Sequence, residues 1–247
     1  MNKFFTNIYP EINLYKKKSP KSEIVTQMIY GERFKIIAKN DKWWKIKIKE
    51  DGYIGFIKKK IFLINKNPTH KICKLYANFY KYPNMKGKVG RLTYGSKITV
   101  KDKVSNFSKF KDGWIKNNFI KPINYKNKDI FFDISIFKNT SYTWGGKSFK
   151  GLDCSALVQL FMNFNNKYCP RDTSKQFKYF KKNIKLKNIK KNDIIYWKGH
   201  VAVALSQKKL IHAYGPRKKT IIMNIKKTIE IIKKTANLDV IGIKRLP

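Results

Sequence analysis

Two stretches in the first half of the chain share an alternating pattern of apolar and polar residues. One runs from Tyr30 to Phe62 and the other from Tyr94 to Ile120, and each contains a Tyr-Gly turn, two alternating strands separated by a polar turn, and an Asp-Gly-aromatic-Ile segment. Short alternating strands punctuated by Gly, Asn and Asp are typical of small β-barrels. We therefore expect two small barrels, over residues 1–66 and 67–122.

The pattern changes after a polar stretch, Lys121 to Asp129, that we interpret as a linker. From Leu152 to Phe164 the apolar residues recur at helical spacing, which predicts a largely buried helix. Later segments alternate with period two and predict consecutive antiparallel strands: Asp193–Trp197, His200–Leu205, Lys209–Tyr214 and Asp239–Leu246. One helix packed on an antiparallel sheet gives an α+β domain, which we expect over residues 123–247.

Composition adds that this is a globular chain. Of its 247 residues, 42% are hydrophobic and 15% aromatic, which is enough to bury one or two cores. The opening residues lack the apolar run of a secretory signal, and no segment approaches the length of a membrane span. We expect a cytoplasmic protein without a membrane partner.

The net charge of +41 invites a nucleic-acid interpretation, because basic surfaces attract phosphate. The basic residues are nearly all lysine, whereas phosphate and base recognition favour the bidentate fork of arginine. An excess of Lys, Asn, Ile, Tyr and Phe is typical of an A+T-rich genome. We therefore expect no nucleic-acid partner, although the charge can attract small acidic substrates.

The three cysteines, Cys73, Cys154 and Cys169, have no CxxC spacing, so neither a disulfide framework nor a zinc ribbon fits. Cys154 follows Asp153 and lies in the first turn of the predicted helix. Free backbone N–H groups at a helix N-terminus stabilise a thiolate, which favours a nucleophile. A cysteine packed in the core is the alternative.

Two histidines accompany this cysteine. His200 and His212 lie 12 residues apart, with a predicted turn at Ser206 to Lys208 between them, so a hairpin can bring them to one end of the sheet. A cysteine on the neighbouring helix then completes a set of nucleophile, base and orienting group. The alternatives are two structural histidines or a zinc site, although the short paired spacing of zinc ligands is missing.

At these residues the chain resembles a known family. The segments SYTWGGKSFKGLDCSALVQLF, YCPRDTSKQ, NDIIYWKGHVAVAL and LIHAYG resemble, in the same order, motifs of the NlpC-type (NlpC and p-sixty) papain-like cell-wall cysteine peptidases. The segments DGYIGFI and DGWIKNNFI resemble closing strands of bacterial SH3-like domains. The resemblance implies a papain-like catalytic domain preceded by two small SH3-like β-barrels.

The resemblance also implies roles for individual residues. Cys154 would be the nucleophile, His200 the general base, His212 the group that orients it, and Tyr142 a contributor to the oxyanion site, unless Tyr142 is only a structural aromatic. The polar groups of the substrate would be bound by Asp153, Ser155, Arg171, Asp172 and Ser174, although an Arg-Asp pair can also be a local ion pair.

In the subgroup that acts on stem peptides, the first SH3-like domain recognises the amine of an N-terminal L-alanine. Glu32 and Tyr53 match the residues that do so, and the alternative for Glu32 is an ordinary ion pair with one of the many lysines. No metal and no organic cofactor are implied. The family's usual glycine after Cys-Ser is Ala156 here, a change that a helix tolerates and that can alter specificity.

We therefore expect hydrolysis of the γ-D-glutamyl to diamino-acid amide bond in short peptidoglycan stem peptides, through an acyl-enzyme on Cys154. The substrate would be a small muropeptide with a free N-terminal L-alanine, and the role would be recycling of wall fragments. Three alternatives remain: a Cys-His amidase or acyl transferase on the same core, a non-catalytic wall-binding protein, and a basic nucleic-acid binder.

Overall fold

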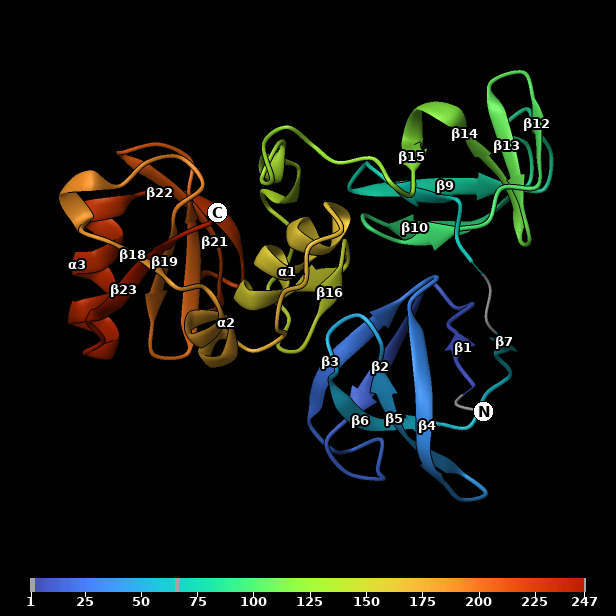
Figure 1. Ribbon diagram of the computed structural model, residues 1–247, viewed down its shortest axis with the longest axis horizontal. Coiled ribbons are helices and arrows are strands. Elements are labelled where there is room, and N and C mark those ends of the chain that lie inside the picture. Colours follow the sequence, from blue (N-terminus) through green and yellow to red (C-terminus); the bar gives the residue numbers. More distant parts are fainter. Residues whose placement is uncertain (1–2, 65–66, 247) are drawn as a thin grey trace. The chain divides into compact units, whose positions relative to one another are not determined.

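The structure is a computed structural model that describes residues 3–64 and 67–246 (Figure 1). Strands dominate it, and the described residues form three α-helices: α1 (Cys154–Phe164), α2 (Thr173–Tyr179) and α3 (Ile225–Ala236). All three helices lie in the second half of the chain. The predicted α+β class is confirmed.

The chain folds into two compact units, and each contains residues from more than one stretch of sequence. The first unit comprises Met1–Lys126 together with Trp144–Phe149. The second comprises Asn127–Thr143 together with Lys150–Pro247. Six residues inside the segment SYTWGGKSFKGLDCSALVQLF, which resembles the nucleophile motif, are therefore part of the first unit.

The beginning of the first unit forms one seven-stranded antiparallel sheet in the order β3-β2-β6-β5-β4-β1-β7. Its strands are β1 (Phe5–Thr6), β2 (Glu11–Tyr15), β3 (Ile24–Ile29), β4 (Arg33–Lys39), β5 (Trp43–Ile48), β6 (Ile54–Lys58) and β7 (Leu63–Ile64). The alternation seen in the sequence sends Leu14, Phe34, Ile46 and Ile57 into one core, where each is fully buried.

The remainder of the first unit is divided between two sheets, with strand orders β10-β9-β14-β13-β12 and β11-β8-β15. The strands are β8 (His70–Ile72), β9 (Tyr76–Tyr80), β10 (Lys88–Thr93), β11 (Lys97–Ile98), β12 (Asp102–Val104), β13 (Phe107–Phe110), β14 (Gly113–Lys116) and β15 (Ile120–Pro122). Among the described residues, the strand orders form no closed ring, so two closed barrels remain a prediction.

The repeated Tyr-Gly turns are confirmed. Gly31 after Tyr30 has φ +83°, and Gly95 after Tyr94 has φ +80°, both in the left-handed region that favours glycine. A Cβ atom on Gly31 would lie 2.0 Å from the Lys97 carbonyl oxygen, so the turn also needs glycine for space. The two similar stretches of sequence therefore use the same turn chemistry.

The stretch interpreted as a linker is partly fixed by a buried lysine. The Lys71 ammonium donates hydrogen bonds to the carbonyl oxygens of Ile123 at 3.0 Å and Tyr125 at 2.5 Å. Burial lowers the pKa of Lys71 to about 8. The first part of the linker is thus held against β8, and the first unit reaches as far as residue 126.

The second unit contains a six-stranded antiparallel sheet in the order β18-β23-β19-β20-β21-β22 (Figure 1). Its strands are β18 (Lys182–Ile184), β19 (Ile194–Trp197), β20 (His200–Ala204), β21 (Lys209–Tyr214), β22 (Lys219–Asn224) and β23 (Val240–Arg245). Helix α1 packs against β20 and β21, and its buried residues include Leu157, Leu160 and Phe161. Helix α3 packs against β22 and buries Ile225 and Ile232.

The predicted helix and the four predicted strands are present, but their connection differs from the prediction. The last strand, β23, pairs with β19 and does not continue from β21, because β22 and α3 intervene. Helix α3 begins after Asn224, whose side chain accepts a hydrogen bond from the backbone N–H of Lys227 at 3.1 Å. Neither β22 nor α3 was predicted from the sequence.

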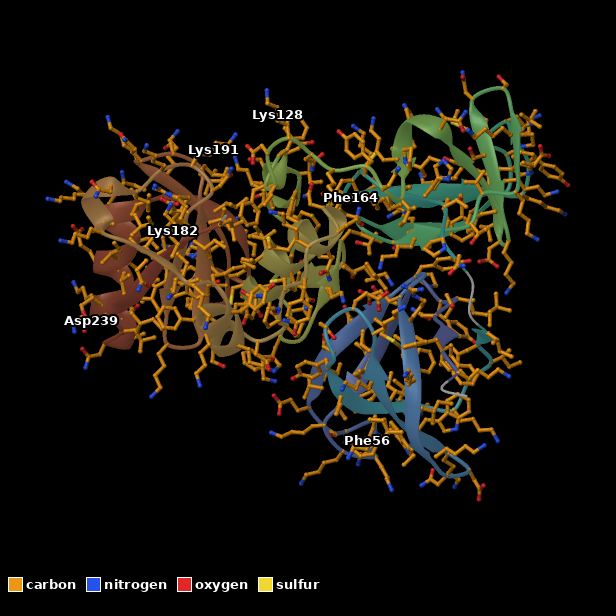
Figure 2. All side chains as sticks on the ribbon, in the orientation of Figure 1. Phe56, Lys128, Phe164, Lys182, Lys191 and Asp239 are labelled. Atoms are coloured by element: carbon orange, nitrogen blue, oxygen red, sulfur yellow. The ribbon has the colours of Figure 1, made fainter. Side chains whose placement is uncertain are left out.

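The high charge of the chain is carried largely by surface lysines. Figure 2 labels Lys128, Lys182 and Lys191, all of which are exposed. Within residues 3–64 and 67–246, no helix combines the length and apolar composition that crossing a membrane requires.

Candidate active site

Cys154 is the first residue of α1, as the sequence predicts. Asp153 is the N-cap, and its carboxylate accepts a hydrogen bond from the backbone N–H of Ala156 at 2.9 Å. Ala156, which replaces the family's glycine, is fully buried inside the helix. The cap and the buried apolar face together fix the position of the cysteine at the start of the helix.

The Cys154 thiol is buried and has two close polar neighbours. Its Sγ lies 4.0 Å from the Thr173 hydroxyl, and it also interacts with the backbone of Val201 by a hydrogen bond that favours the thiolate. Burial nevertheless raises the pKa of the thiol to about 11, and the neighbouring Asp153 carboxylate contributes to this increase. Burial thus dominates the pKa of this thiol, and the thiolate stabilisation expected from the helix N-terminus stays a prediction.

The two histidines lie side by side on adjacent strands. His200 begins β20 and His212 lies in β21, and the Nε2 atom of His200 is 2.9 Å from the Nδ1 atom of His212. The connection between these strands contains the predicted turn around Ser206 to Lys208. The sequence therefore predicted the pairing correctly, and one ring nitrogen of each histidine is used in it.

Aromatic rings surround the histidine pair. The Tyr214 ring stacks on the His212 ring with centroids 4.6 Å apart and an angle of 11° between the planes. The ring centroids of Trp197 and His200 are 5.6 Å apart. Burial lowers the pKa of His200 to about 4 and that of His212 to about 3, and the neighbouring His200 contributes to the lower value. Both imidazoles are therefore neutral near pH 7.

The Cys154 thiol contacts the backbone of β20, the strand that begins with His200. Within the described part of the chain, the hydrogen-bond contacts of Cys154 are with Thr173 and with Val201, the residue that follows His200. Because the His200 Nε2 atom faces His212, a proton that passes from the thiol to His200 would have to go to Nδ1. Catalytic hydrogen bonds in substrate-free enzymes are often long and shorten when substrate binds.

Tyr142 lies in the same electrostatic environment as the cysteine. Its pKa is raised by burial first, and then by electrostatic interaction with Cys154 and with the Asp153 carboxylate. Its backbone N–H donates to the Lys218 carbonyl oxygen at 2.9 Å, and it forms a bridge with Leu152, two residues before Cys154. The phenol therefore stays protonated near Cys154 and can donate a hydrogen bond.

Asp153, Ser155 and Arg171, all predicted to bind substrate, form one buried network. The guanidinium group of Arg171 binds both carboxylate oxygens of Asp153, at 2.9 and 2.5 Å, and also donates to the Ser155 hydroxyl at 2.8 Å. Bidentate pairs of this kind are rigid as well as strong. In this geometry the three side chains bind one another and build the N-terminus of α1.

Ser174 is exposed, whereas its neighbour Thr173 is buried and faces the thiol. Asp172, at the start of α2, forms an exposed ion pair with Lys175 at 3.1 Å. Thr173, which was not among the predicted site residues, is thus the one next to the thiol, and the role of Ser174 stays a prediction. The one available signal was the position of Thr173 directly after the Pro-Arg-Asp run, where the family has serine.

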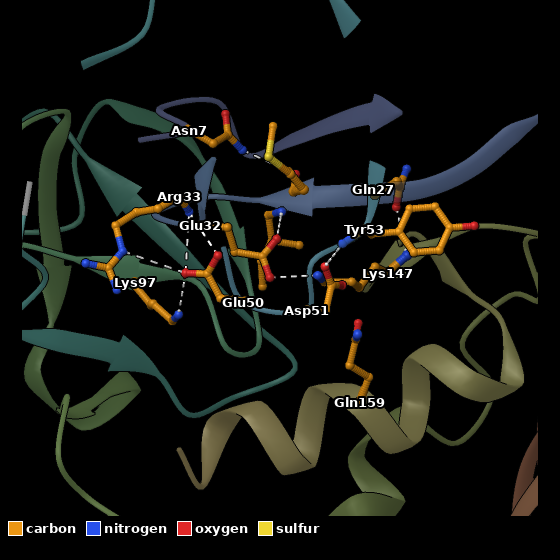
Figure 3. Close-up of polar contacts among 12 residues, drawn as sticks. Asn7, Gln27, Glu32, Arg33, Glu50, Asp51, Tyr53, Lys97, Lys147 and Gln159 are labelled. Atoms are coloured by element: carbon orange, nitrogen blue, oxygen red, sulfur yellow. Dashed lines mark hydrogen bonds and ion pairs between the residues drawn. The ribbon is translucent and has the colours of Figure 1, made fainter. Parts of the chain in front are cut away.

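In the first unit, Glu32, which the resemblance assigns to a substrate amine, is paired with a lysine of the same unit. Its carboxylate lies 2.6 Å from the Lys147 ammonium, and its other oxygen accepts from the backbone N–H of Ile29 at 2.9 Å (Figure 3). Both side chains are buried. The Glu32 carboxylate therefore anchors the Lys147 ammonium. Burial raises the pKa of Glu32, and the Lys147 ammonium opposes this increase.

Tyr53, the second residue expected to bind the amine, is half-buried in the first unit. Its backbone N–H donates to the Asp51 carboxylate at 2.9 Å (Figure 3). This turn places Tyr53 immediately before β6. Its role in recognition stays a prediction.

Comparisons with known proteins match both the beginning and the later part of the chain. A model described as the NlpC/P60 family matches residues 139–235, and one described as the bacterial dipeptidyl-peptidase SH3 domain matches residues 14–60. A curated relative, dipeptidyl-peptidase 6 from Lysinibacillus sphaericus, is 25% identical over 230 residues, which cover 81% of this chain and 84% of the relative.

Solved structures share the fold. An NlpC/P60 family protein from Bacillus cereus ATCC 10987 has a TM-score of 0.83 at 17% identity, with 99% of this chain and 100% of that chain covered. An NlpC/P60 endopeptidase from Photobacterium damselae subsp. piscicida has a TM-score of 0.60 at 12% identity, with 98% and 70% covered. Residues 139–235 of this chain are therefore similar to the NlpC/P60 family, and residues 14–60 are similar to a bacterial SH3 domain.

Proposed function

We propose that this protein is a cysteine peptidase that hydrolyses the γ-D-glutamyl to diamino-acid amide bond of short peptidoglycan stem peptides. The observation that carries the proposal is the arrangement of Cys154 at the start of α1, in contact with the backbone that follows His200, whose ring pairs with His212 at 2.9 Å. A thiol, a neutral imidazole and a second imidazole supply the nucleophile, base and orienting group.

The raised pKa of the thiol and the lowered pKa of the imidazole define the starting state as a neutral pair. When substrate is bound, His200 accepts the proton from Cys154 as Sγ attacks the amide carbon. The resulting imidazolium then gives that proton to the departing amine of the diamino acid, leaving a thioester. Water hydrolyses the thioester with His200 again as base, which releases the γ-carboxylate and restores the thiol.

Tyr142 fits the role of oxyanion donor because its pKa is raised and its hydroxyl stays protonated. The backbone N–H groups of Cys154 and Ser155 would supply further donors, since they precede the first hydrogen bond within α1, whereas the N–H of Ala156 is bound to Asp153. A donor directed at the developing oxyanion stabilises the transition state more than the ground state.

Asp153, Ser155 and Arg171 act in this proposal through the helix N-terminus that they build. Their mutual hydrogen bonds hold Cys154 and the first-turn N–H groups in a fixed position. The same three side chains would also bind polar groups of the substrate, as the resemblance implies. Thr173 joins the set as a neighbour of the thiol.

The relative's name supports the choice of a short substrate. Dipeptidyl-peptidases release two residues from a free N-terminus, which corresponds to L-alanyl-γ-D-glutamate at the start of a stem peptide. With Glu32 bound to Lys147, Tyr53 is the better candidate for the alanine amine, because an aromatic ring can bind an ammonium group by a cation–π contact.

A free short peptide is a product of wall breakdown, so we propose a role in recycling wall fragments in the cytoplasm. The catalytic domain would occupy residues 123–247, and the SH3-like domains residues 1–66 and 67–122, with Trp144–Phe149 packed into the first unit. Cell fractionation with an antibody to the protein tests its location.

The test of function is incubation with L-Ala-γ-D-Glu-diaminopimelate and detection of the products by mass spectrometry. We expect L-Ala-γ-D-Glu and free diaminopimelate in equal amounts. N-acetylation of the alanine should abolish cleavage if the free amine is recognised. Added hydroxylamine separates hydrolysis from acyl transfer, because a transferase would accumulate the hydroxamate in preference to the acid.

Cys154→Ser is the matched control, since it replaces the sulfur by oxygen and preserves the size of the side chain. It should lose activity by roughly 10³-fold or more. Absence of cleavage of this and related stem peptides by the wild-type protein would reject the assignment.

A further inference from the structure

The second ring nitrogen of His212 faces a methionine. The Nε2 atom lies 3.4 Å from the Sδ atom of Met223 on β22. In the β21–β22 register His212 is opposite Ile221 and Leu210 is opposite Met223, so Met223 is the diagonal neighbour of His212 on the same face of the sheet. His212 itself is fully buried.

This contact restricts where the protons of the two histidines lie. A neutral imidazole has one N–H group and one lone pair, whereas a thioether sulfur has no hydrogen and accepts weakly. With the N–H of His212 directed at Sδ, its Nδ1 atom must accept the hydrogen bond from His200 Nε2. The lone pair of His200 then lies on Nδ1, the nitrogen that accepts the Cys154 proton in the proposed mechanism.

The opposite arrangement is unfavourable at both ends. A lone pair on His212 Nε2 would face the lone pairs of the Met223 sulfur at 3.4 Å, and the His212 ring is fully buried, so bulk solvent offers it no replacement hydrogen bond. Nδ1 of His212 would then donate to His200, and His200 would carry its proton on Nδ1. In that tautomer His200 cannot accept the proton of Cys154.

We propose that Met223 is a positioning residue, which selects the His212 tautomer and thereby places the basic lone pair of His200 on Nδ1. This inference rests on the proposed function for its kinetic consequence. The arrangement of protons does not depend on which peptide is cleaved. It can therefore be measured without substrate.

The first test compares Met223→Leu with the wild type. Leucine has a similar volume but no acceptor, so kcat should fall roughly three- to tenfold with little change in KM, because a single weak hydrogen bond is lost. Met223→Gln offers an amide oxygen at this position and should recover most of the loss. Met162→Leu is the matched control, since Met162 is a buried methionine of α1, and it should keep wild-type kcat.

The second test reads the tautomers directly by ¹⁵N NMR of the histidine side chains in the substrate-free protein at pH 7. In the wild type, His212 and His200 should both carry their proton on Nε2, and Met223→Leu should show a mixture of tautomers for both residues. The same tautomers in both proteins would overturn the inference, whatever the activity. A wild-type protein that cleaves no stem peptide would instead reject the proposed function, and the NMR result would still decide the role of Met223.

Discussion

The Lys147 ammonium lies 2.6 Å from the Glu32 carboxylate, 115 residues away in sequence and buried in the same unit. Removing one partner of a buried ion pair leaves an uncompensated charge. Lys147→Met should therefore reduce the free energy of unfolding of this unit by about 3–5 kcal/mol. Urea titration followed by tryptophan fluorescence measures this change.

An exposed pair provides the control for that experiment. Lys233 and Asp239 lie 2.7 Å apart with half or more of each side chain exposed, so Lys233→Met should cost less than about 1 kcal/mol. The double variant Glu32→Leu with Lys147→Met should recover much of the loss, because both charges are removed together. A Lys147→Met protein as stable as Lys233→Met would contradict the proposed anchoring role.

The raised pKa of Cys154 predicts how its reactivity depends on pH. With a pKa of about 11, the thiolate is a minor species at neutral pH, and alkylation by iodoacetamide should accelerate by about tenfold per pH unit between pH 7 and 9. Mass spectrometry of the Cys154 peptide separates its reaction from those of Cys73 and Cys169. A rate that is already constant from pH 6 upwards would show a thiolate–imidazolium pair instead.

Thr173 and Ser174 offer a comparison one residue apart. The Thr173 hydroxyl interacts with the thiol and lowers its pKa, whereas Ser174 is exposed. Thr173→Val should raise the thiol pKa further and slow alkylation of Cys154 at pH 8 by roughly two- to fivefold. Ser174→Ala should react at the wild-type rate. Equal rates for the two variants would remove Thr173 from the site.

The buried histidines predict acid sensitivity. Their pKa values are about 4 and 3 when folded and near 6.5 when unfolded, so the unfolded chain binds more protons between pH 6.5 and 4. Stability should therefore fall as pH decreases through this window, by up to about 1.4 kcal/mol per pH unit for each group. His212→Gln removes one group, and urea midpoints at pH 7.5, 6.5 and 5.5 should show a shallower decline. An identical decline would contradict the buried neutral state.

Much of the catalytic region could be predicted from sequence because its signals are local. The helix that begins at Cys154 shows its period and its cap within 13 residues, and the histidine pair follows from one short hairpin. Helix α3 was missed because lysines interrupt its apolar pattern, and strand β22 was missed because its short apolar run, Ile221–Met223, shows neither period clearly. Without β22 and α3, the last strand, β23, was predicted to follow β21 directly, whereas in the structure it pairs with β19.

The remaining features depend on contacts that local patterns do not encode. Glu32 meets Lys147 across a sequence separation of 115 residues, and any of the many lysines could have been its partner. The thiol pKa depends on burial, which the helix N-terminus argument leaves out. Met223 has no residue type or spacing that marks it, because its role follows from the register of β21 with β22.

The division of the chain has a consequence for what happens after a single backbone cut. A protease cut after Lys126 would leave Trp144–Phe149 on the C-terminal fragment, although this segment packs in the N-terminal unit through the Lys147–Glu32 pair and a 2.9 Å hydrogen bond from Trp144 to Glu23. The two fragments should then co-purify as a non-covalent complex. Separately expressed halves should likewise reassemble, each incomplete until the other is added.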